Sequence, residues 1–139
     1  MTGLHRWSVR VYYEDTDLSG LVYHANYLKF IERARSEMVR AARIDQALMR
    51  TEGLVFAVTR IEADYLLPAR YDDLLEIRTR VTRGTPARFV LEQTVVRDER
   101  LLFRAIVVIA CLDMAGRPKR LPASVRGLLP QDGTPFTRS

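Results

Sequence analysis

The chain has 139 residues, of which 47% are hydrophobic and 9% aromatic, and its only cysteine is Cys111. This length fits one domain, over residues 1–139, around a single and mostly aliphatic core. A lone cysteine excludes an internal disulfide, and the longest apolar run, residues 105–112, is too short to span a bilayer. The first six residues lack the apolar region of a secretion signal. We therefore expect a cytoplasmic protein.

The formal net charge is +5, and among 22 basic residues only Lys29 and Lys119 are lysines. A positive surface attracts nucleic acid, acidic membranes or a phosphorylated small ligand. The arginines are spread along the whole chain, without a dense basic block. This distribution does not predict nucleic-acid binding, and it leaves a membrane surface or a phosphorylated ligand as the anionic partner.

The first half of the chain predicts a strand, a loop and a long helix. Apolar and polar residues alternate over residues 6–13, which is the period of a half-buried strand, and a polar loop follows over residues 14–20. Apolar residues then recur at three- and four-residue spacing from about residue 23 or 26 to residue 43, which predicts a helix with a continuous apolar stripe. Asp45 can cap a short second helix that extends to Arg50 and ends near Gly53.

The second half of the chain predicts four strands in a meander. Residues 54–65 are rich in β-forming side chains, and the alternation over residues 75–82 predicts one buried and one exposed face. A hairpin turn at residues 84–86 leads to strands over residues 87–97 and 101–112. The last of these is apolar on both faces for most of its length, as expected for a central strand. A short helix is expected within residues 121–129 and a frayed end over residues 130–139.

This order of elements predicts an α+β fold, in which one long helix lies against an antiparallel sheet of about five strands. No internal repeat or interdomain linker interrupts the chain. A five-stranded sheet with one helix leaves an open edge, and oligomerisation is a natural way to cover it.

Residues 13–27 contain the main candidates for catalytic residues, because they combine three carboxylates, a glycine and one of the two histidines. This segment joins the first strand to the long helix, whose first turn offers unpaired N–H groups and a positive dipole end. A carboxylate at Asp17 with His24 beside such a helix start has the groups that a hydrolytic site needs. The structural alternatives are that Asp17 is a turn or helix cap and that His24 is an ordinary first-turn residue.

Two motifs resemble those of one enzyme family. The run Tyr-Glu-Asp-Thr-Asp over residues 13–17, then Gly20 and Val-Tyr-His-Ala-Asn-Tyr-Leu-Lys-Phe over residues 22–30, resembles the hot-dog-fold acyl-CoA thioesterases. The match continues over residues 32–37, 61–65 and 68–73, and it looks most like the Tol-Pal-associated branch of the 4-hydroxybenzoyl-CoA thioesterase superfamily. It covers residues 6–112 and fades in the tail.

The resemblance implies a hot-dog fold, in which the sheet wraps the long helix, and a homodimer whose sheets join edge to edge, often paired into a tetramer. It implies that Asp17 is the catalytic carboxylate, as nucleophile or as base. His24 belongs to the active site, and N–H groups of Val22, Tyr23 and His24 receive the thioester carbonyl. Gly20 lets the substrate approach closely, and the substrate is an acyl-CoA.

Other residues near these motifs have a structural and a functional interpretation. Asp15 is expected to stabilise the loop. Tyr27, three residues after His24, is a candidate substrate-binding residue, although it fits the core better than a role as a catalytic donor. Arg83 and Arg88 flank the hairpin turn, where they are either solvated charges or contacts for the CoA phosphates. His5, near the start of the chain, is expected to be exposed to solvent.

Three functions are compatible with these motifs. The first is hydrolysis of an acyl-CoA to a free acid and CoA, without a cofactor or a metal, since no metal-ligand spacing is present. The second is another hot-dog reaction on an acyl thioester, such as hydration or dehydration. The third is a non-catalytic protein that binds a membrane surface or a partner in the cell-envelope machinery.

Overall fold

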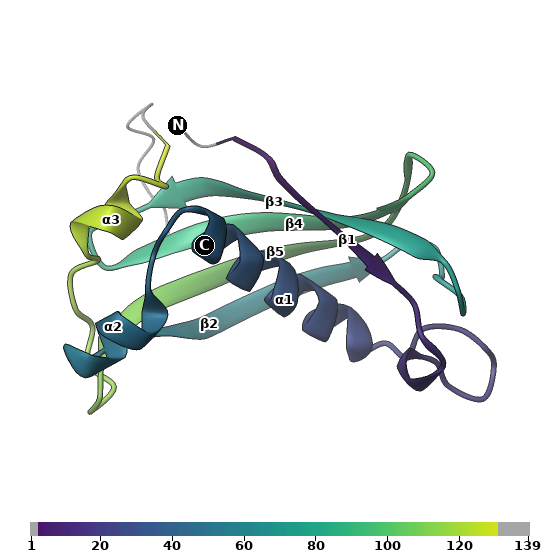
Figure 1. The fold of residues 1–139 in the computed structure, drawn as a ribbon, viewed down its shortest axis with the longest axis horizontal. Helices are drawn as coiled ribbons and strands as arrows, with labels where there is room; N and C mark the ends of the chain where they lie inside the picture. The colour runs from purple at the N-terminus through teal and green to yellow at the C-terminus, as the bar shows by residue number, and fades with distance from the viewer. Residues whose placement is uncertain (1–2, 131–139) are drawn as a thin grey trace.

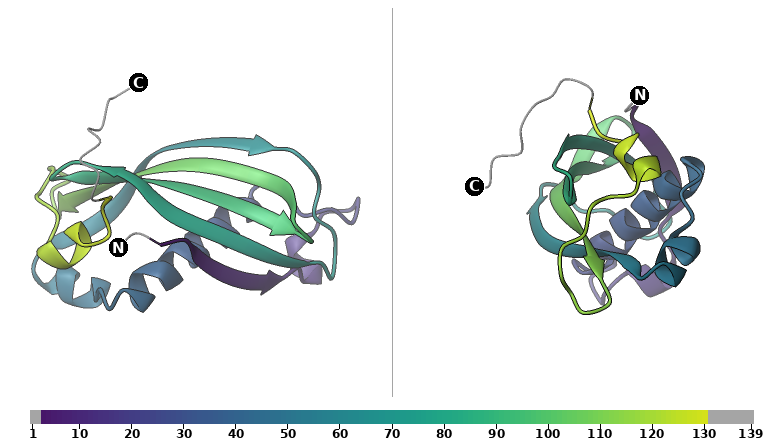
Figure 2. Two further views of the ribbon diagram at one scale, coloured as in Figure 1. Left: turned by 90° about the horizontal axis from the view of Figure 1, so that it is seen from above. Right: turned by 90° about the vertical axis from the view of Figure 1, so that its left-hand side faces the viewer.

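The computed structural model describes residues 3–130, which form one five-stranded antiparallel sheet and a long helix (Figure 1). The long helix α1 lies against one face of the sheet, which curves around it (Figure 2). The α+β expectation is confirmed. In chain order the elements are β1 (His5–Arg10), a 3-10 turn η1 (Tyr13–Asp15), α1 (Asn26–Ala41), α2 (Gln46–Thr51), β2 (Leu54–Tyr65), β3 (Leu74–Gly84), β4 (Arg88–Arg97), β5 (Arg100–Asp113) and α3 (Ala123–Arg126).

The strand order is β1-β3-β4-β5-β2, so the predicted four-strand meander is wrong for β2. Only β3, β4 and β5 form a meander, whereas β2 pairs with β5 at one edge and β1 pairs with β3 at the other. Residues 66–73 carry the chain past the ends of β5 and β4 to reach β3. The N–H groups of Leu66 and Leu67 donate to the carbonyl of Leu102 on the way. Apolar β5 therefore gains a neighbour on each side, as its sequence predicts.

Several predicted boundaries shift for local reasons. Strand β1 ends at Arg10 rather than residue 13, because Val11 donates to the carbonyl of Asp73 and Tyr12 and Tyr13 turn outward. The expected terminal helix is reduced to the four residues of α3. His5 begins β1, and its Nδ1 is buried without a partner among the described residues, so the expectation that His5 is solvated is wrong. The expected frayed end lies, apart from residue 130, outside the described residues.

The apolar stripe of α1 forms the centre of the core. Phe30, Ile31 and Ala34 are fully buried against the sheet. Among these apolar groups lies one buried amide, Gln93 on β4, whose Nε2 donates to the Ile31 carbonyl at 2.8 Å and to the hydroxyl of Thr79 at 2.9 Å. A buried amide is tolerated when it is hydrogen-bonded. Because Gln93 on β4 bonds both α1 and β3, it fixes the position of the helix along these two strands.

Truncating the centre of this stripe should destabilise the fold strongly. Phe30→Ala should lower the free energy of unfolding by about 3–5 kcal/mol, because it removes a fully buried ring and leaves a cavity. Leu28→Ala, on the same helix but 36% exposed, should cost about 1 kcal/mol or less. Urea denaturation followed by circular dichroism measures both, and equal losses would show that the stripe is not the centre of the core.

Candidate active site

The loop between β1 and α1 is anchored by the carboxylate of Asp15, which is 7% exposed. Its Oδ2 accepts the N–H of Tyr12 at 2.8 Å, and its Oδ1 accepts the side-chain amide of Asn26 at 2.8 Å. The Asp15 carbonyl accepts the N–H of Tyr23 at 2.9 Å. Because Asn26 is the first residue of α1, these bonds fix the loop against the start of the helix. The expectation that Asp15 stabilises the loop is confirmed.

Asp17 lies two residues further along, and its carboxylate is exposed. Its Oδ1 accepts the N–H of Ser19 at 2.9 Å and also the hydroxyl of Ser19. The Ser19 hydroxyl, and then its N–H, lower the pKa of the Asp17 carboxyl, so this group is ionised at neutral pH. Among residues 3–130 no hydrogen bond occupies Oδ2. One oxygen of Asp17 is therefore held by the loop, and the other is available to a ligand.

A surface hollow of about 790 Å³ opens beside Asp17. Gly20 lines it with a φ of 80°, a left-handed conformation that costs glycine little. A Cβ on Gly20 would have no heavy atom within 4 Å apart from its chain neighbours, so its backbone faces open space. The rest of the lining is mostly aromatic or polar and comprises Tyr13, Glu14, Thr16, Leu18 and Tyr71. An ionised carboxylate thus faces a space large enough for a ligand.

His24 lies in the turn that precedes α1, and its side chain is exposed. Its ring stacks at a tilt on Tyr23, with 4.6 Å between ring centres, and meets Tyr65 edge-on at 6.4 Å. The Tyr65 hydroxyl donates to the His24 carbonyl at 2.9 Å. Two aromatic rings therefore fix His24, but no hydrogen bond joins it to Asp17 in the described part of the chain.

The backbone N–H groups before α1 are not equally available. The N–H of Val22 donates to the Ala69 carbonyl at 2.8 Å, and that of Tyr23 donates to Asp15. Within residues 3–130 the N–H of His24 has no backbone or side-chain acceptor. Of the three donors expected for a thioester carbonyl, only His24 can therefore supply one without breaking an existing bond.

Tyr27 is a core residue, as the structural interpretation of it predicted. It is 4% exposed, and its ring stacks on Phe103 with 5.0 Å between ring centres. Burial raises the pKa of its hydroxyl, which accepts the N–H of Ala69 at 3.0 Å. Since Ala69 in turn accepts the N–H of Val22, Tyr27 helps to position the loop from beneath.

The turn over residues 68–73 closes the site from the opposite side. Asp73 Oδ2 accepts the N–H of Arg70 at 2.8 Å and pairs with the guanidinium of Arg97 at 2.7 Å. The N–H of Asp72 donates to the Val11 carbonyl at 2.9 Å. The loop that carries Asp17 is thus held by this turn as well as by α1, through bonds between residues 47 apart (Val22 and Ala69) and 61 apart (Val11 and Asp72) in the sequence.

Arg83 and Arg88 lie far from Asp17 within one chain. Strand β3 begins beside the Asp73 turn and ends at Gly84, so Arg83 lies roughly 30 Å along the strand from the site end. Arg88 starts the next strand at the same far end (Figure 1). The structure therefore does not bring these arginines to the Asp17 site of their own chain.

Three further features concern metal binding, membrane spanning and the reactivity of the cysteine in the described part of the chain. Within residues 3–130 no three His, Cys, Asp or Glu residues are grouped so that they could hold a metal ion. No helix in that range is long and apolar enough to cross a membrane. Cys111 is fully buried, and burial raises the pKa of its thiol, which makes it a poor nucleophile.

Comparison with known proteins identifies the family. Residues 11–129 match the thioesterase-like superfamily. The chain is 44% identical over 126 residues to the acyl-CoA thioester hydrolase YbgC of Escherichia coli O6:H1, covering 89% of this chain and 94% of that protein. It is 42% identical over 120 residues to the acyl-CoA thioesterase YbgC of Haemophilus influenzae, covering 85% and 88%.

A solved structure agrees with these relatives. The crystal structure of a probable thioesterase from Bartonella henselae is 44% identical and superposes with a TM-score of 0.83, covering 86% of this chain and all of that one. The fold is therefore the hot-dog fold of thioesterases. The chain belongs to the thioesterase-like superfamily, and the family expected from the sequence is confirmed.

Sequence reasoning missed two residues of this site. Ser19 holds the Asp17 carboxylate, and the Asp-Leu-Ser-Gly order is a recognisable turn in which the aspartate side chain accepts the backbone N–H two residues on. Tyr65 binds the His24 carbonyl from the end of β2, 41 residues away. Tyr65 closes the matched segment 61–65, but that match does not indicate its contact with His24, because only the strand order brings it to the start of α1.

Removing the Ser19 hydroxyl should shift the titration of Asp17. The ionised form of Asp17 is present above its lowered pKa and is lost as the pH falls through it. Ser19→Ala removes the largest cause of that lowering, so the pKa should rise toward the ordinary value for aspartate. A carbon-13 NMR titration of the carboxyl groups measures the shift. Thr16→Ala, whose hydroxyl bonds Tyr13 instead, should leave it unchanged.

Proposed function

We propose that this protein is an acyl-CoA thioesterase that hydrolyses its substrate to a free acid and CoA, with Asp17 as the catalytic carboxylate. The observation that carries the proposal is the state of the Asp17 carboxylate. It is ionised, one of its oxygens is hydrogen-bonded to Ser19, and it lines an open hollow. Two relatives above 40% identity, which match along most of their length, are named acyl-CoA thioesterases or thioester hydrolases. These matches support hydrolysis over hydration or dehydration.

The chemistry needs an oxygen nucleophile and a donor for the developing negative charge. Asp17 Oδ2 either attacks the thioester carbon, giving a mixed anhydride that water then hydrolyses, or takes a proton from an attacking water. In the first route the C–S bond breaks as CoA leaves as a thiolate, and the water that hydrolyses the anhydride supplies the proton that the thiolate takes up. In the second route Asp17 passes the proton taken from water to the leaving thiolate as the C–S bond breaks. The lowered pKa of Asp17 keeps it in the form that both routes require.

In this proposal the carbonyl oxygen accepts the N–H of His24, which has no acceptor within residues 3–130. Losing such a donor typically raises the barrier by about 3–4 kcal/mol. Val22 and Tyr23 serve the site indirectly, because their N–H groups hold the loop in position. Gly20 leaves room for the substrate to approach the Asp17 carboxylate.

The protein is proposed to act in the cytoplasm as a homodimer joined through β2, paired further into a dimer of dimers. In support, β2 is a twelve-residue edge strand that pairs only with β5 among the described strands, and Val58 and Ile61 on it are exposed. A second copy would satisfy the backbone groups of this edge. Any contact of Arg83 or Arg88 with the CoA phosphates then comes from another copy than the one that supplies Asp17.

Asp17→Asn should lower kcat by about a hundredfold or more on a panel of short, long and aromatic acyl-CoAs, because the amide is neither nucleophile nor base. The fold should persist, since Asp17 is exposed. Glu52→Gln, an exposed change after α2, is the matched control and should retain full turnover. Unchanged turnover in Asp17→Asn would remove Asp17 from the mechanism.

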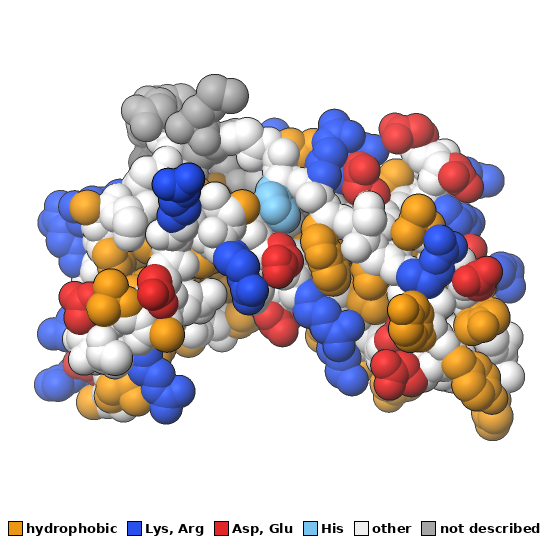
Figure 3. All heavy atoms as spheres, viewed as in Figure 1, with side chains coloured by type: hydrophobic (Ala, Val, Ile, Leu, Met, Phe, Trp, Pro, Cys, Tyr) orange, Lys and Arg blue, Asp and Glu red, His pale blue; other side chains and the backbone are white. Residues whose placement is uncertain are grey.

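A second proposal is peripheral binding to anionic membranes through the loop end of the molecule, which consists of the β1–α1 loop and the turn over residues 68–73. Figure 3 shows hydrophobic side chains at this end among both basic and acidic ones. Leu18 is fully exposed, and the exposed fractions are 82% for Tyr13 and 59% for Tyr71. Exposed apolar groups beside basic ones suit a membrane surface or a partner in the envelope machinery.

Cosedimentation with phosphatidylglycerol vesicles tests the membrane proposal. Binding should fall with added salt and should weaken several-fold in Leu18→Ser. Leu48→Ser, which changes a leucine that is 57% exposed on α2, is the matched control and should bind like the wild type. Equal binding of both variants would exclude the loop end as the membrane-facing surface.

A further inference from the structure

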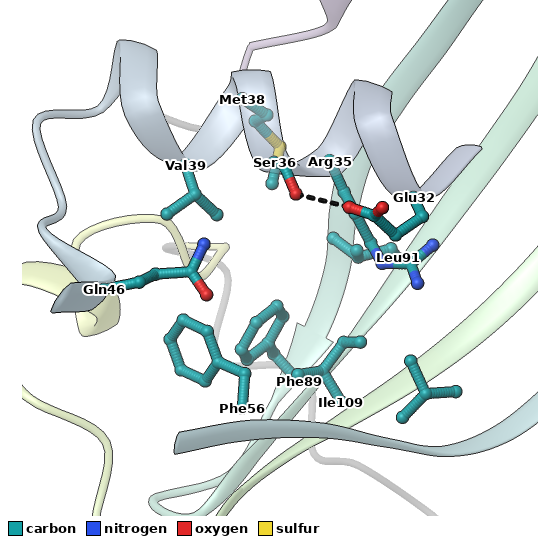
Figure 4. A pocket seen from close by; sticks show the side chains of 11 residues that line it. Glu32, Arg35, Ser36, Met38, Val39, Gln46, Phe56, Phe89, Leu91 and Ile109 are labelled. Atoms are coloured by element: carbon teal, nitrogen blue, oxygen red, sulfur yellow. Dashed lines mark hydrogen bonds between the residues drawn. The ribbon is translucent and has the colours of Figure 1, made fainter. Parts of the chain in front are cut away.

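A second cavity, of about 170 Å³, lies between the C-terminal half of α1 and the sheet. Figure 4 shows Glu32, Arg35 and Ser36 on its α1 side, together with Met38 and Val39, and Gln46 of α2 at one end. Its opposite wall is apolar and consists of Phe56 on β2, Phe89 on β4 and Ile109 on β5. The cavity therefore has one apolar side and one mixed side, which carries a single cation and a single carboxylate. Neither Asp17 nor His24 lines it.

The cation in this cavity lacks an anionic partner. Arg35 is half-buried, and burial lowers the pKa of its guanidinium, although arginine stays charged. Its one hydrogen bond within residues 3–130 runs from Nη1 to Gln93 Oε1 at 3.3 Å, and no carboxylate there lies within 4.0 Å of it. Glu32, one turn earlier, attracts it at longer range and accepts the Ser36 hydroxyl at 2.7 Å. A partly desolvated charge with a single neutral partner is unfavourable.

We propose that this cavity binds a small amphipathic carboxylate, whose apolar body lies against Phe56, Phe89 and Ile109 and whose oxygens accept hydrogen bonds from Arg35. A planar guanidinium fits a carboxylate in a two-pronged contact. A cavity of 150 Å³ can hold benzene, so the body comprises about six carbon atoms. A phosphate is disfavoured, because one cation and an apolar wall cannot replace its hydration, and because Glu32, which lines the cavity and repels any anion, repels two negative charges more strongly than one.

This site is separate from the Asp17 site of the same chain. Arg35 lies nine residues after Asn26, which is about 14 Å along the helix from its start. The same ligand chemistry has two sources: a free carboxylic acid, or the far end of an acyl group that itself carries a carboxylate. In either case the inference goes beyond the proposed hydrolysis, and a binding measurement tests it without reference to turnover.

Isothermal titration calorimetry with hexanoate, and with 1-hexanol as the neutral probe, tests the site. Hexanoate should bind the wild type about ten- to hundredfold more tightly than it binds Arg35→Met, which keeps the length and helix preference of the side chain but not the charge. Hexanol should bind both equally weakly. Arg33→Met, an exposed arginine of the same helix, is the matched control and should bind hexanoate like the wild type.

A second variant keeps the charge but reduces the space. Ser36→Leu should weaken the binding of hexanoate and of hexanol alike, because it fills the α1 side of the cavity. Unliganded melting temperatures and sedimentation velocity confirm that each variant keeps its fold and oligomeric state. Equal hexanoate affinity in the wild type and Arg35→Met would overturn the proposal. So would a loss of binding that accompanies dissociation of subunits, since Arg35 would then serve the interface.

Turnover distinguishes the two sources of the carboxylate. If the acyl end occupies the cavity, the acyl chain has to span the distance from the start of α1 to Arg35, so Arg35→Met should lower kcat/KM for dodecanedioyl-CoA about tenfold more than for dodecanoyl-CoA. If the ligand is a free acid, Arg35→Met should lose hexanoate binding with no change in the ratio of the two kcat/KM values. Both results support a carboxylate site at Arg35.

Discussion

The site depends on the buried carboxylate of Asp15, which holds the β1–α1 loop against the helix. A carboxylate that is 7% exposed is favourable only because both of its oxygens accept hydrogen bonds, one from the Tyr12 backbone and one from the Asn26 amide. These bonds leave the second aspartate of the motif, Asp17, on the outer side of the loop. The two aspartates thus differ in their surroundings: Asp15 is buried and positions the loop, and Asp17 is exposed at the hollow, where we propose that it meets the substrate.

The same loop is held from below by residues far away in the sequence. The hydroxyl of Tyr27, the backbone of Ala69 and the N–H of Val22 form a continuous chain of contacts from the core to the loop. The strand order makes this possible, because the connection from β2 to β3 has to cross the sheet beside the start of α1. Placing β2 at the edge therefore both brings Tyr65 to His24 and leaves an edge open to a second copy.

Local patterns predicted most elements of the fold but not their arrangement. The periodicity of α1 and the apolar character of β5 are properties of contiguous residues, so both elements could be recognised from the sequence. The position of β2 next to β5 could not, because pairing with β3 or with β5 buries similar side chains and only the whole sheet decides between them. The same holds for Tyr65, whose role follows from that pairing.

Within the site, the resemblance to thioesterases identified the segment, and the structure refined the roles of its residues. Val22, Tyr23 and His24 look equivalent as backbone donors in a sequence, whereas the structure shows acceptors for the first two and none for His24 among the described residues. Arg83 and Arg88 sit next to a turn in the sequence, and only the direction of β3 places them at the far end from Asp17. Arg35 lies within the matched segment 32–37, but the sequence assigned it no role, since its significance depends on the cavity that it faces.

The most direct measurement is a crystal structure of the Asp17→Asn variant with an intact acyl-CoA bound. The account predicts that the thioester carbon lies about 3–3.5 Å from the side chain of residue 17, with its carbonyl oxygen accepting the N–H of His24. A thioester bound away from this loop, or a carbonyl oxygen directed at a different donor, would contradict the assignment of Asp17 and His24.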